Sequence, residues 1–321
     1  MVDIDRKKIT SHTTLDTVLF SGGKGLSVLV MAGVHGDETD GVLIAARLIR
    51  RLSNAEICGT VRILCVANPP AFHRGLRCIP DSGDLNRAFT GRGGNSPVHD
   101  IAATIETEFI AEAGLVMDLH TGGRAVTYHP TAMIPETAWQ SSAQAYATLI
   151  AQFGFPAFLY DGADDHPSSV FGACARSGCR ALSAELGGGS AVNPDTIQRA
   201  TDGILAVLSG LGILPDRLGR LGRLNRGNPA DAPPLVFHRR RADQSPRAEF
   251  DGLFEPAVVP GAWVKKGDPM GYLHDPSAIW DPPAVIRADC DGVVLCLRAA
   301  ARTPAGEILA KIGVPLKGSH R

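Results

Sequence analysis

The sequence predicts an α/β fold, a β-sheet layered with helices, followed by an all-β module. Between residues 26 and 214, short apolar runs such as "LSVLVMA" and "GLVMDLH" alternate with stretches that have helical spacing. Such alternation is typical of a sheet covered by helices. After Pro215 a stretch rich in Arg, Gly and Pro leads into short strand-like pieces. The expected division is a domain of residues 1–214, then a linker and a β-rich C-terminal domain at residues 215–321.

Periodicity and local signals give the individual elements. Residues 98–113, for example, place Ile101, Ile105 and Phe109 on one helical stripe. Asn193 followed by Pro194 is a favourable start for a helix. The expected helices are 39–52, 98–113, 137–153 and 193–212. The expected strands are 26–32, 60–68, 114–120 and 179–187, and in the second domain 252–258, 262–273, 284–299 and 306–314.

The composition narrows the class of protein. The chain has 321 residues, of which 44% are hydrophobic and 20% charged, as in a globular protein. A formal net charge of -1 gives no reason to expect nucleic acid or an anionic membrane as a partner. No apolar run approaches the roughly 20 residues that span a bilayer. The polar N-terminus and seven cysteines without a C-x-x-C pair favour a cytoplasmic protein with reduced thiols.

A first candidate for chemistry is "GVHGDE", where a strand gives way to a helix. His35 and Glu38 are three residues apart, so both can reach one ion if the chain turns into a helix there. Gly33 and Gly36 allow a tight turn of the backbone. Imidazole and carboxylate together suit zinc. The alternative is an ordinary polar turn, and this motif alone does not decide between the two.

A second candidate is "VMDLHTGG". Side chains alternate along a strand, so Asp118 and His120 share one face, with His120 toward a site and Asp118 as an orienting acid. Strand ends are also where open α/β sheets collect ligands. A histidine hydrogen-bonded to a neighbouring loop is the alternative.

Two further pieces add charge. The loop at residues 68–89 is long for a compact domain and carries arginines suited to binding carboxylates and stabilising an oxyanion. Its alternative is a solvated surface loop. Glu185, in "SAELGGGS", ends an apolar run, where a carboxylate is costly without a partner or a function. A salt-bridged acid at a strand end is the alternative for Glu185.

Together these pieces predict an open catalytic zinc site with two histidines and one glutamate as ligands. Such a site keeps a position for water, and a carboxylate such as Glu185 can act as general base on that zinc-bound water. The prediction is one Zn²⁺ per chain.

The motifs "GVHGDE", "DLNRAF", "DLHTG" and "AELGGG", in this order, resemble the succinylglutamate desuccinylase/aspartoacylase family of the zinc carboxypeptidase clan. The resemblance implies a mixed β-sheet flanked by helices, with a barrel-like all-β second domain as in bacterial members. It also implies hydrolysis of a small N-acyl amino acid. Within the family the glycine-rich pattern is similar to bacterial N-acetyl-2,4-diaminobutyrate deacetylases, and bacterial relatives make a homo-oligomer plausible.

The resemblance also implies roles for particular residues. His35, Glu38 and His120 match the zinc ligands, and Glu185 matches the base. Arg77 stands where the family has the arginine that polarises the scissile carbonyl. The expected substrate-binding residues are Asn68, Asn86 and Arg87, the last two as the pair that grips the substrate's carboxylate. The spacer "CIPDSG" after Arg77 departs from the short acidic link of mammalian aspartoacylases.

Other functions stay open at this stage. A zinc carboxypeptidase would use the same ligands on a short peptide. The β-rich domain is similar to lipoyl- and biotinyl-type carriers, which present a modified lysine at a hairpin tip. Lys265 and Lys266 instead precede the Gly-Asp turn, where such folds have a structural turn and not an attachment point. Asp164, Asp165 and His166 precede the base and are candidates for lining the pocket by position alone.

Overall fold

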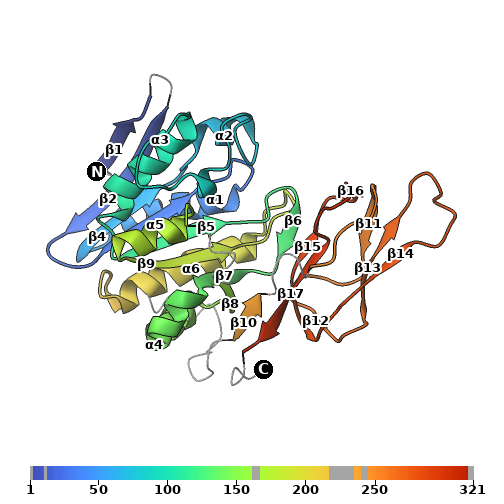
Figure 1. Cartoon of the computed structure of the whole chain (residues 1–321). Helices are drawn as coiled ribbons and strands as arrows, with labels where there is room; N and C mark the ends of the chain where they lie inside the picture. Colours follow the sequence, from blue (N-terminus) through green and yellow to red (C-terminus); the bar gives the residue numbers. More distant parts are fainter. Residues whose placement is uncertain (1–2, 11–12, 161–166, 217–234, 240–244, 317–321) are drawn as a thin grey trace.

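The protein is described here by a computed structural model, which covers residues 3–10, 13–160, 167–216, 235–239 and 245–316. Its main feature is one large mixed sheet, which crosses the molecule in Figure 1. The strands of its first part, in spatial order, are β1 (Asp3–Lys8), β2 (Thr14–Gly22), β4 (Gly59–Leu64), β3 (Ser27–Ala32), β5 (Leu115–His120), β9 (Arg180–Glu185), β7 (Thr131–Pro135) and β8 (Ala157–Tyr160).

The centre of this sheet is parallel. Strands β4, β3, β5 and β9 run in the same direction, whereas β2 and β7 are antiparallel to their neighbours β4 and β9. Buried strands of this kind are nearly continuous apolar runs, as in "SVLVMA" of β3. The predicted mixed sheet flanked by helices is confirmed.

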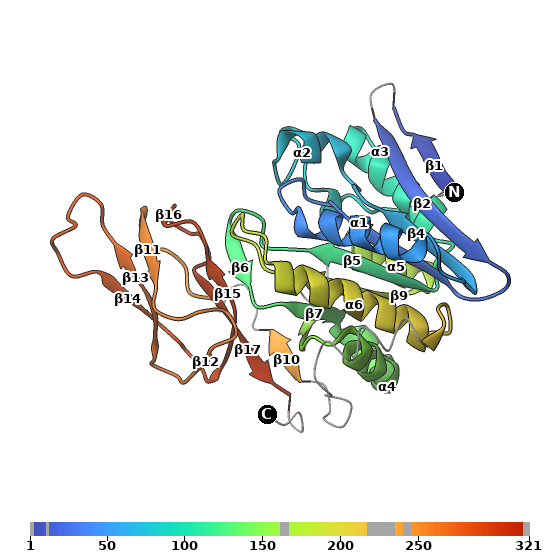
Figure 2. The same cartoon turned by 180° about the vertical axis from the view of Figure 1, so that it is seen from behind.

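Helices cover both faces of the sheet (Figures 1 and 2). One face packs against α1 (Asp40–Leu52), α4 (Glu136–Phe153) and α6 (Pro194–Gly210). The other packs against α3 (Pro97–Thr104), the π-helical turn η2 (Ile105–Ile110) and α5 (Val170–Ser177). Two short helices, α2 (Pro69–Arg74) and η1 (Leu85–Arg87), lie in the loop after β4. Within the described residues, no helix has both the length and the apolar character needed to cross a membrane.

The second part of the chain continues the same sheet. Strand β10 (Val236–Arg239) pairs in parallel with β8, and β17 (Ala310–Pro315), β15 (Gly292–Arg298) and β12 (Trp263–Val264) follow outward, while β6 (Val126–Tyr128) pairs with β15. A second, antiparallel sheet consists of β14 (Ala284–Arg287), β13 (Pro269–His274), β11 (Gly252–Pro256) and β16 (Arg302–Thr303). Apolar side chains of both sheets form one core between them. The all-β character of this part is confirmed. The division at residues 214 and 215 stays a prediction, and the sheet runs across it.

Most of the expected elements are present, with three informative differences. The strand predicted at 60–68 ends at Leu64, because Asn68 already caps α2. The helix predicted at 98–113 changes from α to π at Ile105. Strands β1, β2, β6, β7, β8 and β10 were not predicted; several are short and have neither strict alternation nor a long apolar run.

Candidate active site

The predicted site residues meet at the carboxyl ends of three neighbouring strands. His35 and Glu38 follow β3, His120 is the last residue of β5, and Glu185 is the last residue of β9. His120 and Glu185 stand opposite each other in the β5–β9 ladder. Because parallel strands end at the same edge of a sheet, residues far apart in sequence are brought side by side. Asp118 and His120 share one face of β5, as predicted. The alternating residues Met117 and Leu119 point to the opposite face and pack in its core.

Two glycines shape the turn that carries His35 and Glu38. Gly33 has φ +66, a left-handed conformation that favours glycine. A Cβ added at Gly36 would lie 2.1 Å from the carbonyl carbon of Ala71. This loop therefore lies against α2 more closely than any other residue at position 36 would allow.

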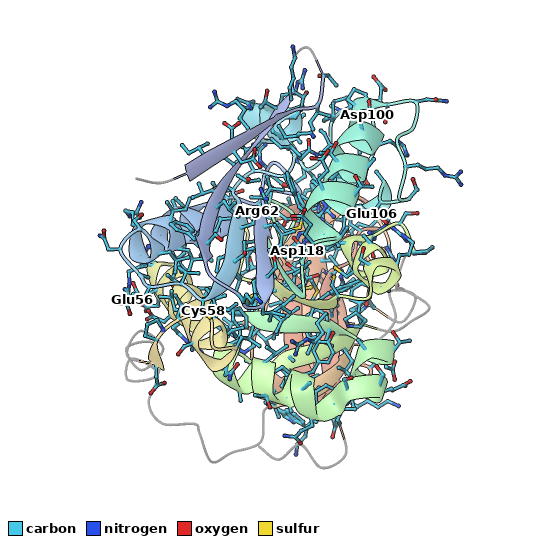
Figure 3. All side chains as sticks on the ribbon, turned by 90° about the vertical axis from the view of Figure 1, so that its left-hand side faces the viewer. Glu56, Cys58, Arg62, Asp100, Glu106 and Asp118 are labelled. Carbon is cyan, nitrogen blue, oxygen red and sulfur yellow. The ribbon has the colours of Figure 1, made fainter. Side chains whose placement is uncertain are left out.

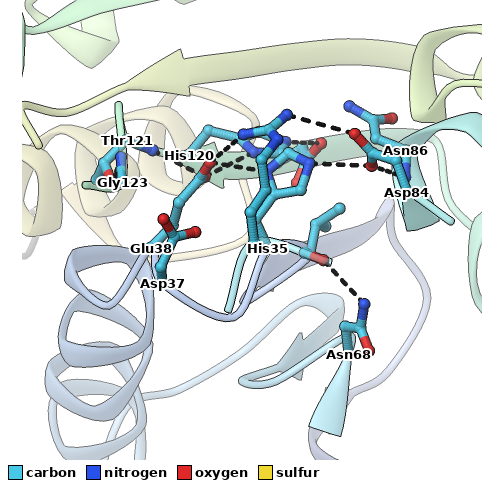
Figure 4. A network of polar contacts seen from close by, with 12 residues as sticks. His35, Asp37, Glu38, Asn68, Asp84, Asn86, His120, Thr121 and Gly123 are labelled. Atoms are coloured by element: carbon cyan, nitrogen blue, oxygen red, sulfur yellow. Dashed lines mark hydrogen bonds and ion pairs between the residues drawn. The ribbon is translucent and has the colours of Figure 1, made fainter. Parts of the chain in front are cut away.

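Glu38 lies between the two imidazoles (Figure 4). His35 Nδ1 is 2.7 Å from Glu38 Oε1, and His120 Nδ1 is 2.9 Å from Glu38 Oε2. The Nε2 atom of each ring lies against a different carboxylate, Asp84 at 3.1 Å for His35 and Asp118 at 2.7 Å for His120. All three central side chains are at most 4% exposed. In both rings Nδ1 therefore faces Glu38, and a second carboxylate holds the ring at Nε2.

The charges of this cluster are strongly coupled. Burial disfavours the charged form of Glu38, but the two imidazoles together hold the pKa of its carboxyl well below the ordinary value. Burial likewise opposes a charged His120, yet Asp118 and Glu38 raise the pKa of its imidazole well above the ordinary value. A divalent cation would compete for the same inward nitrogens and, once bound, would take the place of these protons.

The donor set fits a metal ion. One atom each of His35, Glu38 and His120 lies within 4.8 Å of the others, and all three residues are buried. Two imidazole nitrogens and a carboxylate oxygen are a usual ligand set for catalytic zinc. The acid behind each ring is the arrangement that orients metal-binding histidines. The three residues predicted as ligands are therefore the ones that could hold Zn²⁺.

Arg77 reaches the same cluster from the loop after α2. Its Nη1 donates to Glu38 Oε1 at 3.1 Å, and its Nη2 donates to Asp84 Oδ2 at 3.4 Å. Burial alone would lower the pKa of the guanidinium, but the two carboxylates raise it, so its positive charge is kept. The side chain is 54% exposed and faces the cavity. Its charge is thus available to a substrate oxygen beside the ligands.

Glu185 has a strongly raised pKa, and its carboxyl makes no ion pair among the described residues. Burial raises its pKa to about 8, and the negative charge of Glu38 adds to the rise. Its Oε2 atom is buried and makes no hydrogen bond among the described residues. A cation bound beside it would lower this pKa, because positive charge favours the carboxylate. A carboxyl of this kind is poised for proton transfer near neutral pH.

The predicted substrate-binding residues divide into two groups. Asn86 and Arg87, on η1, line the cavity, and Arg87 is exposed with Nη1 donating to the carbonyl of Asn86. Asn68 does not: it is fully buried, caps α2 by accepting from Ala71 N, and donates to Val34 O at 3.4 Å. Asn68 is drawn below the cluster in Figure 4. Its contacts support the β3–α1 turn, and its substrate-binding role stays a prediction that these contacts do not favour.

These residues surround a cavity of about 480 Å³. Its walls come from the β3–α1 turn, η1, the ends of β5 and β9, and α5, with β6, β7, β8 and β17 on the other side. This volume is in the usual range for small-molecule sites. Asp164, Asp165 and His166 lie outside the described residues.

Comparison with known proteins agrees with this geometry. Residues 24–211 match the model of the succinylglutamate desuccinylase/aspartoacylase catalytic domain, which covers most of the chain. The chain belongs to this family.

Several bacterial proteins are similar to this chain. The N-alpha-acetyl-L-2,4-diaminobutyric acid deacetylase of Halomonas elongata is 29% identical over 302 residues, 90% of this chain and 82% of that protein. A crystal structure of a succinylglutamate desuccinylase/aspartoacylase from Rhodobacter sphaeroides has a TM-score of 0.81 at 25% identity, covering 98% of this chain and 96% of that one. The product-bound ectoine utilization protein EutE (DoeB) of Ruegeria pomeroyi has a TM-score of 0.82 at 24% identity, covering 98% and 95%.

Sequence reasoning missed several residues that line the cavity, among them three polar ones. Tyr128 belongs to β6. Lys311 lies in β17 of the β-rich part, and Glu307 lies shortly before that strand. Lys311 Nζ donates to Tyr128 OH at 3.1 Å, and Arg298 Nη1 donates to Glu307 Oε2 at 2.8 Å. The only signal for Lys311 was a lysine inside the apolar run "ILAKIGV", which does not by itself point to a site nearly 200 residues away. The C-terminal part therefore contributes a wall of the cavity.

A partly buried ion pair lies beside the segment that follows η1. Arg176 of α5 donates through Nε to Glu106 Oε1 at 2.8 Å and through Nη2 to the carbonyl of Phe89 at 3.0 Å. Glu106, labelled in Figure 3 on the helical layer, also accepts from Gly91 N at 2.8 Å. Since Glu106 is only 5% exposed, these donors replace the water that its carboxylate oxygens would otherwise contact.

We expect Arg176→Ala to lower the free energy of unfolding by about 2 kcal/mol, because a buried carboxylate loses a charged partner. Urea unfolding followed by circular dichroism measures this difference. The matched control is Arg92→Ala, an exposed arginine, which should stay within about 0.5 kcal/mol of wild type. Equal stabilities of the two variants would show that Glu106 does not need Arg176.

Proposed function

We propose that this protein is a zinc-dependent hydrolase that cleaves the amide bond of a small N-acyl amino acid. The observation that carries the proposal is the convergence of His35, Glu38 and His120 in one cavity, with Glu185 opposite His120 on the neighbouring strand. The family match and the deacetylase relative from Halomonas elongata support the reaction class.

His35, Glu38 and His120 would hold the zinc ion, with Asp84 and Asp118 fixing the two rings. When bound, zinc supplies Lewis acidity, which acidifies water and polarises a carbonyl oxygen. The residues around it supply the rest of the reaction.

Glu185 acts as the general base and then as the general acid. Its carboxylate accepts a proton from the water whose oxygen attacks the amide carbonyl carbon. It then delivers that proton to the leaving nitrogen as the C–N bond breaks, so a carboxylic acid and an amine are released. Burial raises the pKa of the Glu185 carboxyl and a cation bound beside it would lower that pKa again, so the group is suited to accept a proton and return it.

Arginines bind the charged parts of the substrate and of the tetrahedral intermediate. Arg77 donates to the carbonyl oxygen as negative charge develops on it, and it is held toward the site by Glu38 and Asp84. Arg87, assisted by Asn86, binds the α-carboxylate of the amino acid. A substrate whose carboxylate is blocked should therefore be hydrolysed poorly.

We expect Arg87→Ala to raise KM for an N-acyl amino acid by about 10- to 100-fold, the usual effect of losing a charged hydrogen bond. The change in kcat should be much smaller, because Arg87 binds a part of the substrate that does not react. Steady-state kinetics on the acid and on its C-terminal amide provide the control, since the amide should respond little to the mutation. An unchanged KM for the acid would remove Arg87 from the site.

Metal analysis coupled to a substrate panel tests the proposal as a whole. One zinc per chain is expected, with hydrolysis of N-acyl amino acids that is lost on chelation and restored by zinc. A C-terminally free peptide in the same panel tests the zinc carboxypeptidase alternative. No hydrolysis of any N-acyl amino acid by the zinc-loaded protein would overturn the proposal.

The carrier alternative has a separate test. Lys265 and Lys266 lie in the turn between β12 and β13. The backbone N–H of Lys265 donates to Asp268 in the same turn, and that of Lys266 donates to Asp291, just before β15. These bonds explain the turn as structure. An intact mass of the purified protein equal to the sequence mass would exclude a modified lysine.

A further inference from the structure

The sheet face that floors the cavity changes from polar to apolar across neighbouring strands. Residues directly opposite each other on paired strands point to the same face. The row that begins at Asp118 therefore continues, strand by strand, through Ser183, Met133, Phe158 and Phe237. Neighbouring strands are about 4.8 Å apart, so the apolar end begins within two strands of the catalytic carboxylate on β9.

An aromatic pair completes the apolar end. Tyr160 follows Phe158 on the same face of β8, and its ring centroid is 6.0 Å from that of Phe171 in an edge-to-face arrangement. Both rings are partly exposed and line the cavity, as does Met133. Both rings pack against a buried hydrophobic cluster of Met133, Phe158, Phe237, Val293 and Leu295.

Three of the charged side chains that line the described cavity wall have partners of their own. Arg77 is bound to Glu38 and Asp84, Lys311 donates to Tyr128, and Glu307 accepts from Arg298. A charged group seated against Met133 and Phe171 would lose water without gaining a partner from these two side chains, which is costly. An apolar group would instead leave water for a matching surface.

The position of the apolar end relative to Asn86 decides which part of the substrate meets it. Asn86 Oδ1 accepts a hydrogen bond from Val170 N at 2.9 Å, and Phe171 is the next residue of α5. With the α-carboxylate bound by Asn86 and Arg87, the α-carbon would lie on the α5 side of the cavity, which Val170 and Phe171 line. The side chain is bonded to that carbon directly, whereas the acyl chain is separated from it by the amide nitrogen and carbonyl carbon.

We infer that Met133, Tyr160 and Phe171 form a subsite for a large apolar side chain, so that the substrates are N-acyl derivatives of aromatic or branched aliphatic amino acids. This inference rests on the proposed hydrolase function. It differs from the amino acid named for the Halomonas relative, 2,4-diaminobutyric acid, whose side chain carries an amine.

The test compares kcat/KM of the zinc-loaded protein across N-acetyl amino acids. N-acetylphenylalanine and N-acetylleucine should exceed N-acetylalanine by about tenfold or more, the usual effect of filling a hydrophobic pocket. N-acetylaspartate and N-acetyl-2,4-diaminobutyrate should be no better than N-acetylalanine. A higher value for either charged substrate than for N-acetylphenylalanine would overturn the inference. The inference would also be overturned if kcat/KM exceeded that of N-acetylalanine for N-benzoylalanine but not for N-acetylphenylalanine, because the apolar end would then bind the acyl group.

Two variants locate the subsite. Phe171→Gln should lower the ratio of kcat/KM for N-acetylphenylalanine over N-acetylalanine by about tenfold, because a polar amide replaces the ring. Phe171→Leu keeps an apolar surface and should keep most of that ratio. The ratio is unaffected by a general loss of folded or metal-loaded protein, because such a loss lowers kcat/KM for both substrates by the same factor. An unchanged ratio in Phe171→Gln would contradict the assignment.

Calorimetric binding separates the inference from the proposed reaction. Wild type should bind free phenylalanine at least about tenfold more tightly than alanine, whether or not it hydrolyses the acylated forms. If phenylalanine binds more tightly than alanine but no N-acyl amino acid is hydrolysed, the proposed reaction is overturned and the subsite is supported. Hydrolysis of N-acyl amino acids with equal binding of phenylalanine and alanine would overturn the subsite and leave the reaction standing.

Discussion

Glu185→Gln should lower kcat for an N-acyl amino acid by about 10²- to 10⁴-fold, the usual cost of losing a general base. An amide cannot accept the proton from water or return it to the leaving nitrogen. The substitution keeps the shape of the side chain, so binding of substrate should change much less than turnover. Steady-state kinetics on the best N-acetyl amino acid measure both quantities.

The chain offers a matched control for this variant. Glu112→Gln makes the same chemical change at an exposed glutamate far from the cavity, where the side chain is 70% exposed and its nearest charged partner is 4.0 Å away. It should behave as wild type. Zinc content should be equal in all three proteins, because Glu185 is not one of the proposed ligands. A Glu185→Gln protein with full zinc and a kcat within tenfold of wild type would show that another group moves the proton.

Sequence reasoning found the centre of the site because its signals are local. His35 and Glu38 lie in one short turn with its glycines, and Asp118 and His120 alternate along one strand. The parallel pairing of β3, β5 and β9 then brings these separate strand ends together. Local motifs and a general rule of α/β sheets were sufficient for this part.

The walls of the cavity could not be found in the same way. Lys311 reaches Tyr128 only because β15 pairs with both β6 and β17, a contact between residues 183 positions apart. Such long-range pairing leaves no periodic signal in either segment. The apolar subsite has the same origin, since Met133 and Phe171 are ordinary apolar residues until the register of β7, β8 and β9 is known.

Asn68 shows the opposite difficulty. Its place before a polar loop made a substrate-binding role reasonable, but a residue that follows a strand and precedes Pro-Pro is also a favourable helix cap. The cap geometry is what the fold contains, with Ala71 N donating to Asn68 Oδ1 at 3.3 Å. Spacing alone does not separate a residue that supports a site from one that touches the substrate.

Zinc binding should fall in a graded way when the ligand cluster is changed. His120→Ala removes a proposed ligand, so zinc measured by mass spectrometry of the dialysed protein should drop from one per chain to near zero. Asp118→Asn keeps the ligand but weakens the contact that orients its ring, and such changes typically lower metal affinity by about 10- to 100-fold. The order of affinities should be wild type, Asp118→Asn, His120→Ala.

This order distinguishes a metal site from a merely polar cluster. His99→Ala is the matched control, since His99 contacts Ser96 at the start of α3 and lies outside the cavity; it should keep one zinc per chain. If the three buried side chains only stabilised the strand ends, His120→Ala and Asp118→Asn would lower the unfolding free energy and leave the zinc content of the folded protein unchanged. Full zinc in folded His120→Ala would therefore remove His120 from the ligand set, and with it the reason for assigning Asp118 a role behind the ring.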